Sequence, residues 1–116
     1  MINGKQNTYF PNDFPQELLS LGHSLESIGI SEFAWKSEDA LNVINFLVSK
    51  GYAILGGDVY VCTDKGFESI YDSWYVNKSV SERFIEESRD KAFEYIMKYT
   101  EINGSNYLYS IVFELV

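Results

Sequence analysis

The pattern of apolar residues in the middle of the chain predicts a β-hairpin. Residues 52–62 form an apolar run that is interrupted by Gly-Gly-Asp at residues 56–58. A glycine pair inside a strand is typical of a bulge, a bend or a close approach of another backbone, so we expect one of these there. Gly66 suits a short hairpin loop, and residues 67–71 alternate as the second strand.

Apolar residues at spacings of three and four predict two longer helices. The first should begin with Ser37 as its cap, pack one apolar stripe on the following strand, and end at Lys50 and Gly51. The second should begin with a capping box at residues 79–82 (SVSE) and run uninterrupted over residues 79–100. Its outer face carries a run of charged residues, which is usual for a solvated helix face.

The two ends of the chain are less regular. Residues 1–12 are polar and predict a mobile arm or a docked strand. Residues 14–22 predict a short helix that starts at Pro15 and turns its leucines inward. Residues 24–35 predict a loop with at most a short strand, whereas residues 107–116 predict a strand that is apolar on both faces and therefore central.

These elements predict the α+β fold class. We expect a small, mostly antiparallel sheet of about three strands, with two longer helices and one short N-terminal helix packed on it. Both longer helices have one apolar stripe, so they should share one face of the sheet. A chain of 116 residues has room for one modest core, which predicts a single domain over residues 1–116.

The net charge of −8 changes the list of expected partners. Nucleic acids and anionic membranes are bound through lysine and arginine, so neither is an expected partner. The field of an acidic protein favours a cationic partner, although acidity also serves solubility alone. The N-terminus lacks the hydrophobic segment of a signal peptide, and no apolar run is long enough to span a membrane, which predicts a cytoplasmic protein.

Candidate chemistry is sparse. Cys62 is the only cysteine and His23 the only histidine, and they are far apart in sequence, so no activated nucleophile and no metal site is expected. No phosphate-binding glycine motif is present, and no cofactor is expected. Asp58 and Asp72 are the carboxylates near the hairpin, where they could perform acid–base chemistry or bind a hard cation. The alternative is that each bonds local backbone amides at a bend or turn.

Two short motifs carry a resemblance to a known family. They are ILGGDVY at residues 54–60 and IYDSWY at residues 70–75, which follow a helix containing residues 38–41 (EDAL) and precede one containing residues 92–96 (AFEYI). This arrangement resembles the immunity protein 40 family. Its members are small bacterial proteins that are encoded beside polymorphic toxins and protect the producing cell. The resemblance implies a cognate toxin domain as partner, and it assigns no role to individual residues.

Two hypotheses follow. In the first, the chain is a non-catalytic immunity protein that binds and neutralises a toxin domain, which its own acidity suggests is basic. In the second, it is a small cytoplasmic hydrolase or ligand-binding domain that uses a cleft at residues 56–58. For the first hypothesis, aromatic and acidic residues around the hairpin are the candidate interface, because tyrosine and tryptophan dominate interface hot spots. The candidates are Asp58, Tyr71, Asp72, Trp74 and Tyr75, with Glu86, Glu87 and Asp90 on the last helix as a second choice.

Overall fold

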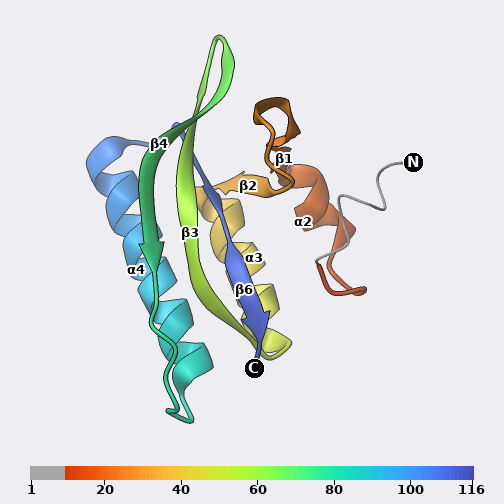
Figure 1. Cartoon of the computed structure of the whole chain (residues 1–116), viewed down its shortest axis with the longest axis vertical. Helices are drawn as coiled ribbons and strands as arrows, with labels where there is room; N and C mark the ends of the chain where they lie inside the picture. Colours follow the sequence, from red (N-terminus) through yellow and green to blue (C-terminus); the bar gives the residue numbers. More distant parts are fainter. Residues whose placement is uncertain (1–9) are drawn as a thin grey trace.

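The computed structural model describes residues 10–116. Three α-helices, one 3₁₀ turn and six strands follow one another in this part of the chain (Figure 1). In chain order they are α2 (Gln16–Leu21), β1 (His23–Ser24), η1 (Glu26–Ile28), β2 (Phe33–Lys36), α3 (Ser37–Ser49), β3 (Tyr52–Thr63), β4 (Gly66–Tyr75), α4 (Phe84–Asn103), β5 (Tyr107–Ser110) and β6 (Val112–Leu115).

The strands form one antiparallel sheet around β3. One side of β3 pairs with β4, and the other side pairs with β6 and then with β5 (Figure 1). Beyond β5 lie β2 and β1, which gives the order β1-β2-β5-β3-β4. The turn of the β3–β4 hairpin projects past the rest of the sheet (Figure 1).

The fold class is therefore α+β, but the expected sheet of about three strands was wrong, because residues 10–116 form six strands. Two of the extra strands, β1 and β2, are only two and four residues long, and β2 is held by pairing to β5 and β1 by pairing to β2, rather than by their own alternation. The third arises because the C-terminal strand is divided at Ile111 into β5 and β6. Whether such short strands form depends on their pairing with distant segments, and the local sequence pattern does not show that pairing.

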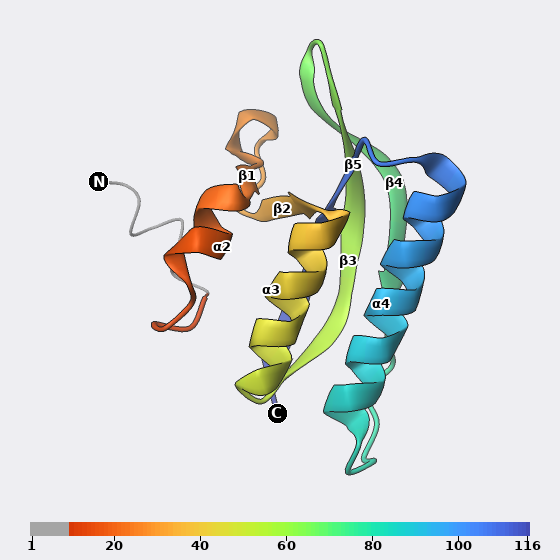
Figure 2. The same cartoon turned by 180° about the vertical axis from the view of Figure 1, so that it is seen from behind.

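Both longer helices lie on the same face of the sheet, as expected (Figure 2). Helix α3 buries one stripe of residues against β3, namely Ala40, Val43, Ile44 and Leu47. It ends as predicted, with Lys50 at the C-cap and Gly51 at a left-handed φ of 91°. Its predicted cap was wrong, because Lys36 is the N-cap residue and no side chain caps the helix.

Helix α4 is a single uninterrupted helix, but it starts later than predicted. Residues 79–82 do not form a capping box, and the helix begins at Phe84. The Ser79 and Ser81 hydroxyls instead accept hydrogen bonds from the amides of Ser81 and Arg83, at 2.9 and 3.0 Å. Serine side chains bond amides two residues ahead as readily as they cap helices, so the same pattern here forms a turn before the helix.

The N-terminal part packs on the core through aromatic rings. Residues 1–9 of the predicted mobile arm lie outside the described residues, whereas Phe10 is buried and stacks on Phe14 at 4.3 Å between ring centroids. Helix α2 packs Leu18 and Leu19 on the core. Leu21 is exposed, contrary to the expectation that every leucine of this helix turns inward.

A close backbone approach at Gly57 explains the glycine pair in β3. A Cβ atom on Gly57 would lie 2.0 Å from the carbonyl oxygen of Ser110 and 2.5 Å from the Trp74 ring. A Cβ on Gly56 would lie 2.3 Å from the Trp74 carbonyl oxygen. The predicted close approach is thus confirmed, and the pairing of β3 with β6 also shifts register between Ile54 and Gly56.

Two clusters of buried side chains lie on opposite faces of the sheet. The larger one fills the space between the sheet and the two helices, and it includes Trp35, Ile44, Val59 and Tyr109. The smaller one lies on the other face, where the segment around η1 covers the sheet, and consists of Leu25, Ala34, Tyr60 and Leu108. Because η1 is short, it leaves much of the hairpin uncovered on that face.

Candidate interaction surfaces on the hairpin

A bulge in β4 shapes the centre of the hairpin. Asp58 pairs with Ser73 and Tyr60 pairs with Ser69, so three residues of β4 oppose a single residue of β3. Within the bulge, Tyr71 has a φ of 64° and is the only non-glycine residue of the described chain with a positive φ. Its ring is 90 % exposed, so no burial compensates for this conformation. Strained backbone of this kind costs on the order of 1–3 kcal/mol and tends to persist at functional sites.

The outer hairpin face is the surface opposite the helices, made of Asp58, Tyr60, Phe67, Glu68, Ser69 and Tyr71. Together with Ile28 and Ile30 these residues line an open hollow of about 750 Å³. The floor is aromatic. Asp58 and Glu68 also line the hollow, and neither forms an ion pair with any described residue, although the Glu68 carboxylate accepts a hydrogen bond from the Thr63 hydroxyl at 3.4 Å. The pKa of nearby Glu32 is raised by loss of solvation and by the charge of Asp58.

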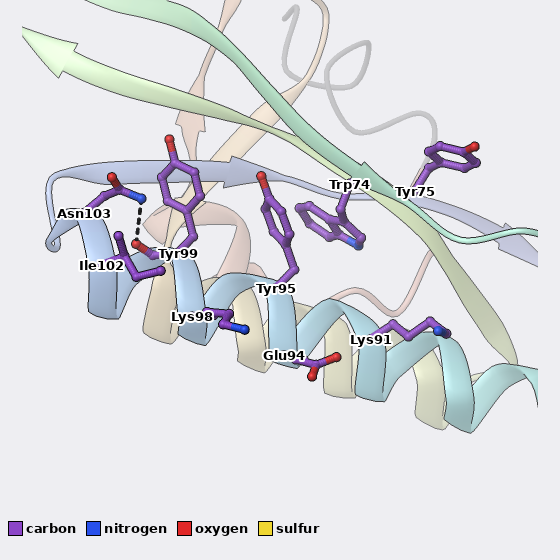
Figure 3. Close-up of a pocket in the computed structure, with 9 residues that line it drawn as sticks. All are labelled: Trp74, Tyr75, Lys91, Glu94, Tyr95, Lys98, Tyr99, Ile102 and Asn103. Carbon is purple, nitrogen blue, oxygen red and sulfur yellow. Dashed lines mark hydrogen bonds between the residues drawn. The ribbon is translucent and has the colours of Figure 1, made fainter.

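The β4–α4 groove is the second surface, and it lies on the helix side of the hairpin (Figure 3). Its volume is about 520 Å³. Trp74 and Tyr75 line it from β4, and Lys91, Glu94, Tyr95, Lys98, Tyr99, Ile102 and Asn103 line it from α4. Lys91 and Lys98 form no ion pair within the described part of the chain.

Trp74 forms the wall of this groove and is also part of the core. The residue is only 9 % exposed, and its ring stacks on Tyr95 with 5.0 Å between centroids. Its indole N–H is buried and has no hydrogen-bond partner among the described residues. In Figure 3 the nitrogen-bearing edge of the ring is turned toward α4. An unsatisfied buried donor costs about 1–3 kcal/mol, so this N–H is an anomaly that needs an explanation.

A tyrosine–aspartate hydrogen bond joins the two elements at one end of the groove. The Tyr99 hydroxyl donates to the Asp72 carboxylate at 2.7 Å, and the bulge presents Asp72 to the helix. Loss of solvation and this hydrogen bond raise the pKa of Tyr99 far above its usual value. Loss of solvation and the charge of Asp72 also raise the pKa of Tyr95. The raised pKa values extend the pH range over which both phenols stay protonated.

The structure divides the five candidate residues between these two surfaces. Asp58 and Tyr71 lie on the outer hairpin face, and Trp74 lines the groove with its ring toward α4. Tyr75 borders the groove, but its ring points away from α4 (Figure 3). Asp72 bonds Tyr99, a residue of the groove. Tyr75 is 78 % exposed, so it is free to contact a partner.

The second set of candidates lies on the first turns of α4. Glu86 pairs with Arg83 at 3.0 Å and Asp90 with Arg89 at 3.3 Å. Glu87 is exposed and forms no ion pair within the described residues. Local arginines thus balance two of the three charges, which makes this face less anionic than its sequence suggested.

No assembled catalytic group appears in the described residues. The His23 ring packs on Phe67, the strand partner of Cys62, yet no hydrogen bond joins His23 to Cys62 in this part of the chain. No cluster of three or more metal-ligating side chains occurs among residues 10–116. The Asp58 amide N–H is not free to donate to a ligand, because it donates to the Ser110 hydroxyl at 3.1 Å. No helix of the described chain is long and apolar enough to cross a membrane.

Several residues of both surfaces were not found from the sequence. The sequence placed three of them, Lys91, Tyr95 and Lys98, on a helix but did not show what the helix faces. The hairpin that they oppose is distant in the chain, so the groove could not be predicted. Phe67 lies on the second strand and pairs with Cys62, so alternation could have placed it on the same face as Asp58, whereas alternation assigns Glu68 to the other face. The bulge at Tyr71 had no usable signal, since tyrosine is unusual at a positive φ.

The molecule is thus a small α+β protein whose most prominent surfaces combine exposed tyrosines with unpaired charges, a composition suited to contacts with another protein. A family model described as immunity protein 40 matches residues 24–113, and the chain belongs to this family of immunity proteins. The match confirms the resemblance carried by the two hairpin motifs. No curated protein and no solved structure matches the chain.

Proposed function

We propose that this protein is a non-catalytic inhibitor that binds a cognate toxin domain through its outer hairpin face and thereby neutralises it. Family membership supports a toxin as the partner. We choose this surface because of Tyr71. Its strained backbone holds an exposed side chain beside carboxylates that form no ion pairs with described residues. Exposed aromatic rings next to charges are typical of interface hot spots.

Charge supports a basic toxin surface as the partner of this face. The chain carries a net charge of −8, and Asp58 and Glu68 rim the hollow without cationic neighbours in ion-pair contact among the described residues. A field of this sign accelerates association with a cationic surface and weakens as salt is added. The same proposal holds that the protein is part of a polymorphic toxin system. It acts in the cytoplasm, where a toxin directed at the producing cell must be neutralised.

The competing hypothesis, a hydrolase or ligand-binding cleft at residues 56–58, receives no support from the geometry. The Trp74 ring and neighbouring backbone atoms occupy the space beside Gly56 and Gly57. Asp58 faces the outer hairpin face rather than a cleft between the glycines. We therefore place its carboxylate in the protein interface.

The test uses the toxin domain encoded beside the gene for this protein, which is the expected partner. Co-expression should rescue cell growth, and the purified proteins should form a complex whose association slows as salt is raised. The double variant Asp58→Lys, Tyr71→Ala should fold and lose both complex formation and protection. A matched control, Glu101→Lys with Met97→Ala, changes one exposed charge and one exposed apolar side chain on α4 and should retain both. Full protection by the first variant would exclude the outer hairpin face.

A further inference from the structure

Strand β4 has an open edge. It is the last strand of the described sheet and pairs only with β3. The Val76 amide donates to the Leu55 carbonyl at 2.9 Å, and the Trp74 carbonyl lies against Gly56, so both of these groups point toward β3. Backbone groups alternate in direction along an antiparallel strand, which directs the amides and carbonyls of Ser73 and Tyr75 outward. Such an edge is a ready site for one more strand.

The β4–α4 groove runs beside this edge and offers side-chain contacts to the same occupant. Trp74 is more than nine-tenths buried, lines the groove and holds an indole N–H with no partner among the described residues. Lys91 and Lys98 lie seven residues apart on α4, where neither forms an ion pair with a described residue, and Glu94 is the only carboxylate among the lining residues (Figure 3). Two lysines against one glutamate give the lining residues a net charge of +1 on a molecule of net charge −8. The Asp72 carboxylate at one end of the groove is held by the Tyr99 hydroxyl.

We propose that the β4–α4 groove binds a short extended peptide segment with acidic side chains, which adds a strand to the open edge of β4. Its backbone pairs with Ser73 and Tyr75, and its carboxylates meet Lys91 and Lys98. One of its oxygens accepts the hydrogen bond of the Trp74 indole. Strand addition beside a helix supplies affinity through the backbone and selectivity through the groove. The charge of this site is opposite to that of the outer hairpin face, so it is a second site that does not depend on the toxin.

The bulge at Tyr71 sets the end of this site. Regular pairing of β4 with β3 is lost between Ser69 and Ser73, and the strand leaves its straight path there. An added strand can therefore follow β4 only from Ser73 toward Val76. This length favours a short linear segment over the edge of a second folded sheet.

The experiment is an NMR titration of the full chain, which contains only two tryptophan indoles, Trp35 and Trp74. The probe is a short capped peptide of alternating valine and glutamate. The Trp74 indole and the Ser73 and Tyr75 amides should shift, whereas the Trp35 indole, which donates to the Leu18 carbonyl at 2.7 Å, should not. The variant Ser73→Pro removes one outward amide while sparing the bonds to β3, and it should weaken binding, whereas Ser73→Ala should not.

A second pair of variants tests charge without touching the strand. Lys91→Gln with Lys98→Gln should weaken peptide binding about tenfold. Lys36→Gln with Lys65→Gln makes the same change in net charge away from the groove and should have no such effect. The proposal is overturned by unshifted groove resonances at millimolar peptide, or by equal shifts with a lysine-containing peptide. Shifts that grow with protein concentration in the absence of peptide would assign the groove to a second copy and would also overturn it.

Discussion

At the scale of single residues, Tyr71 and Trp74 looked alike in the sequence but have different surroundings in the structure. Both are aromatic residues of the same short motif, and both were candidates for partner contact. The structure buries Trp74 against Tyr95 and leaves Tyr71 exposed on a strained backbone. We expect one change at each position to separate the two roles, with stability responding to Trp74 and toxin binding responding to Tyr71.

For Tyr71, replacement by glycine should remove the ring without loss of stability. Relief of the left-handed conformation gains about 1–2 kcal/mol, and the greater freedom of glycine in the unfolded chain costs about 0.5–1 kcal/mol. We expect Tyr71→Gly to be as stable as the parent protein or slightly more stable in urea unfolding, and Tyr71→Ala to keep the strain. Both variants should bind the toxin more weakly. A clear loss of stability in Tyr71→Gly would show that the exposed ring has a structural role.

For Trp74, truncation should act on the core. Trp74→Ala removes a ring that covers Gly57 and stacks on Tyr95, and should cost about 3–5 kcal/mol in urea unfolding. Tyr75→Ala, next in the chain but largely exposed, is the control and should cost less than about 0.5 kcal/mol. Equal and small costs for both variants would mean that the ring of Trp74 contributes little to the packing.

At the scale of elements, one buried serine connects the long helix to the central strand. The Ser88 hydroxyl on α4 accepts a hydrogen bond from the Ile54 amide at 2.9 Å and donates to the Ile85 carbonyl at 2.7 Å. The Ile54 amide lies next to the register shift between β3 and β6, where the sheet itself offers it no regular partner. Ser88 thus fixes α4 to β3 at the irregular point of the strand.

Loss of the Ser88 hydroxyl should lower the stability of the fold more than most changes of a single atom do. Ser88→Ala leaves the Ile54 amide buried and unpaired, so we expect a loss of about 1–3 kcal/mol in the free energy of unfolding. Ser81→Ala removes a hydroxyl that bonds an exposed amide before the same helix, and it should cost less. Hydrogen exchange at the Ile54 amide should also accelerate in Ser88→Ala. Unchanged exchange at that amide would contradict the role given to Ser88.

The elements also show how far the sequence could predict this fold. The stripe on α3, the long α4 and the glycines beneath Trp74 all follow from local pattern, and each was found. Strand β2 depends on pairing with β5, which is distant in the chain, and β1 depends on pairing with β2. The sequence therefore allowed at most a short strand within residues 24–35 and did not predict β1. The groove was missed for the same reason, because Lys91 and Trp74 meet only after the hairpin lies over α4. The sequence therefore identified the residues of the motif, but it did not predict that they lie on two different surfaces of the hairpin.

At the scale of the whole molecule, tyrosines with raised pKa values lie on both faces of the sheet. Loss of solvation is the main cause at Tyr60, Tyr95, Tyr99 and Tyr109. Neighbouring carboxylates add to the effect, Asp58 for Tyr60 and Asp72 for Tyr95 and Tyr99. The folded protein therefore holds these phenols neutral at a pH where the unfolded chain ionises them.

The sign of the resulting pH dependence follows from proton binding. Above the unfolded tyrosine pKa of about 10, the unfolded chain releases phenolic protons that the folded state retains. Stability from this source is complete below that pH and falls as the pH rises, so the free energy of unfolding should drop steeply between about pH 10 and pH 12. In Tyr99→Phe the slope should be smaller by close to one proton, because Tyr99 has the largest increase in pKa. Urea unfolding at a series of pH values measures this slope. An equal slope in the parent and in Tyr99→Phe would show that the bond to Asp72 does not hold the Tyr99 proton in the folded state.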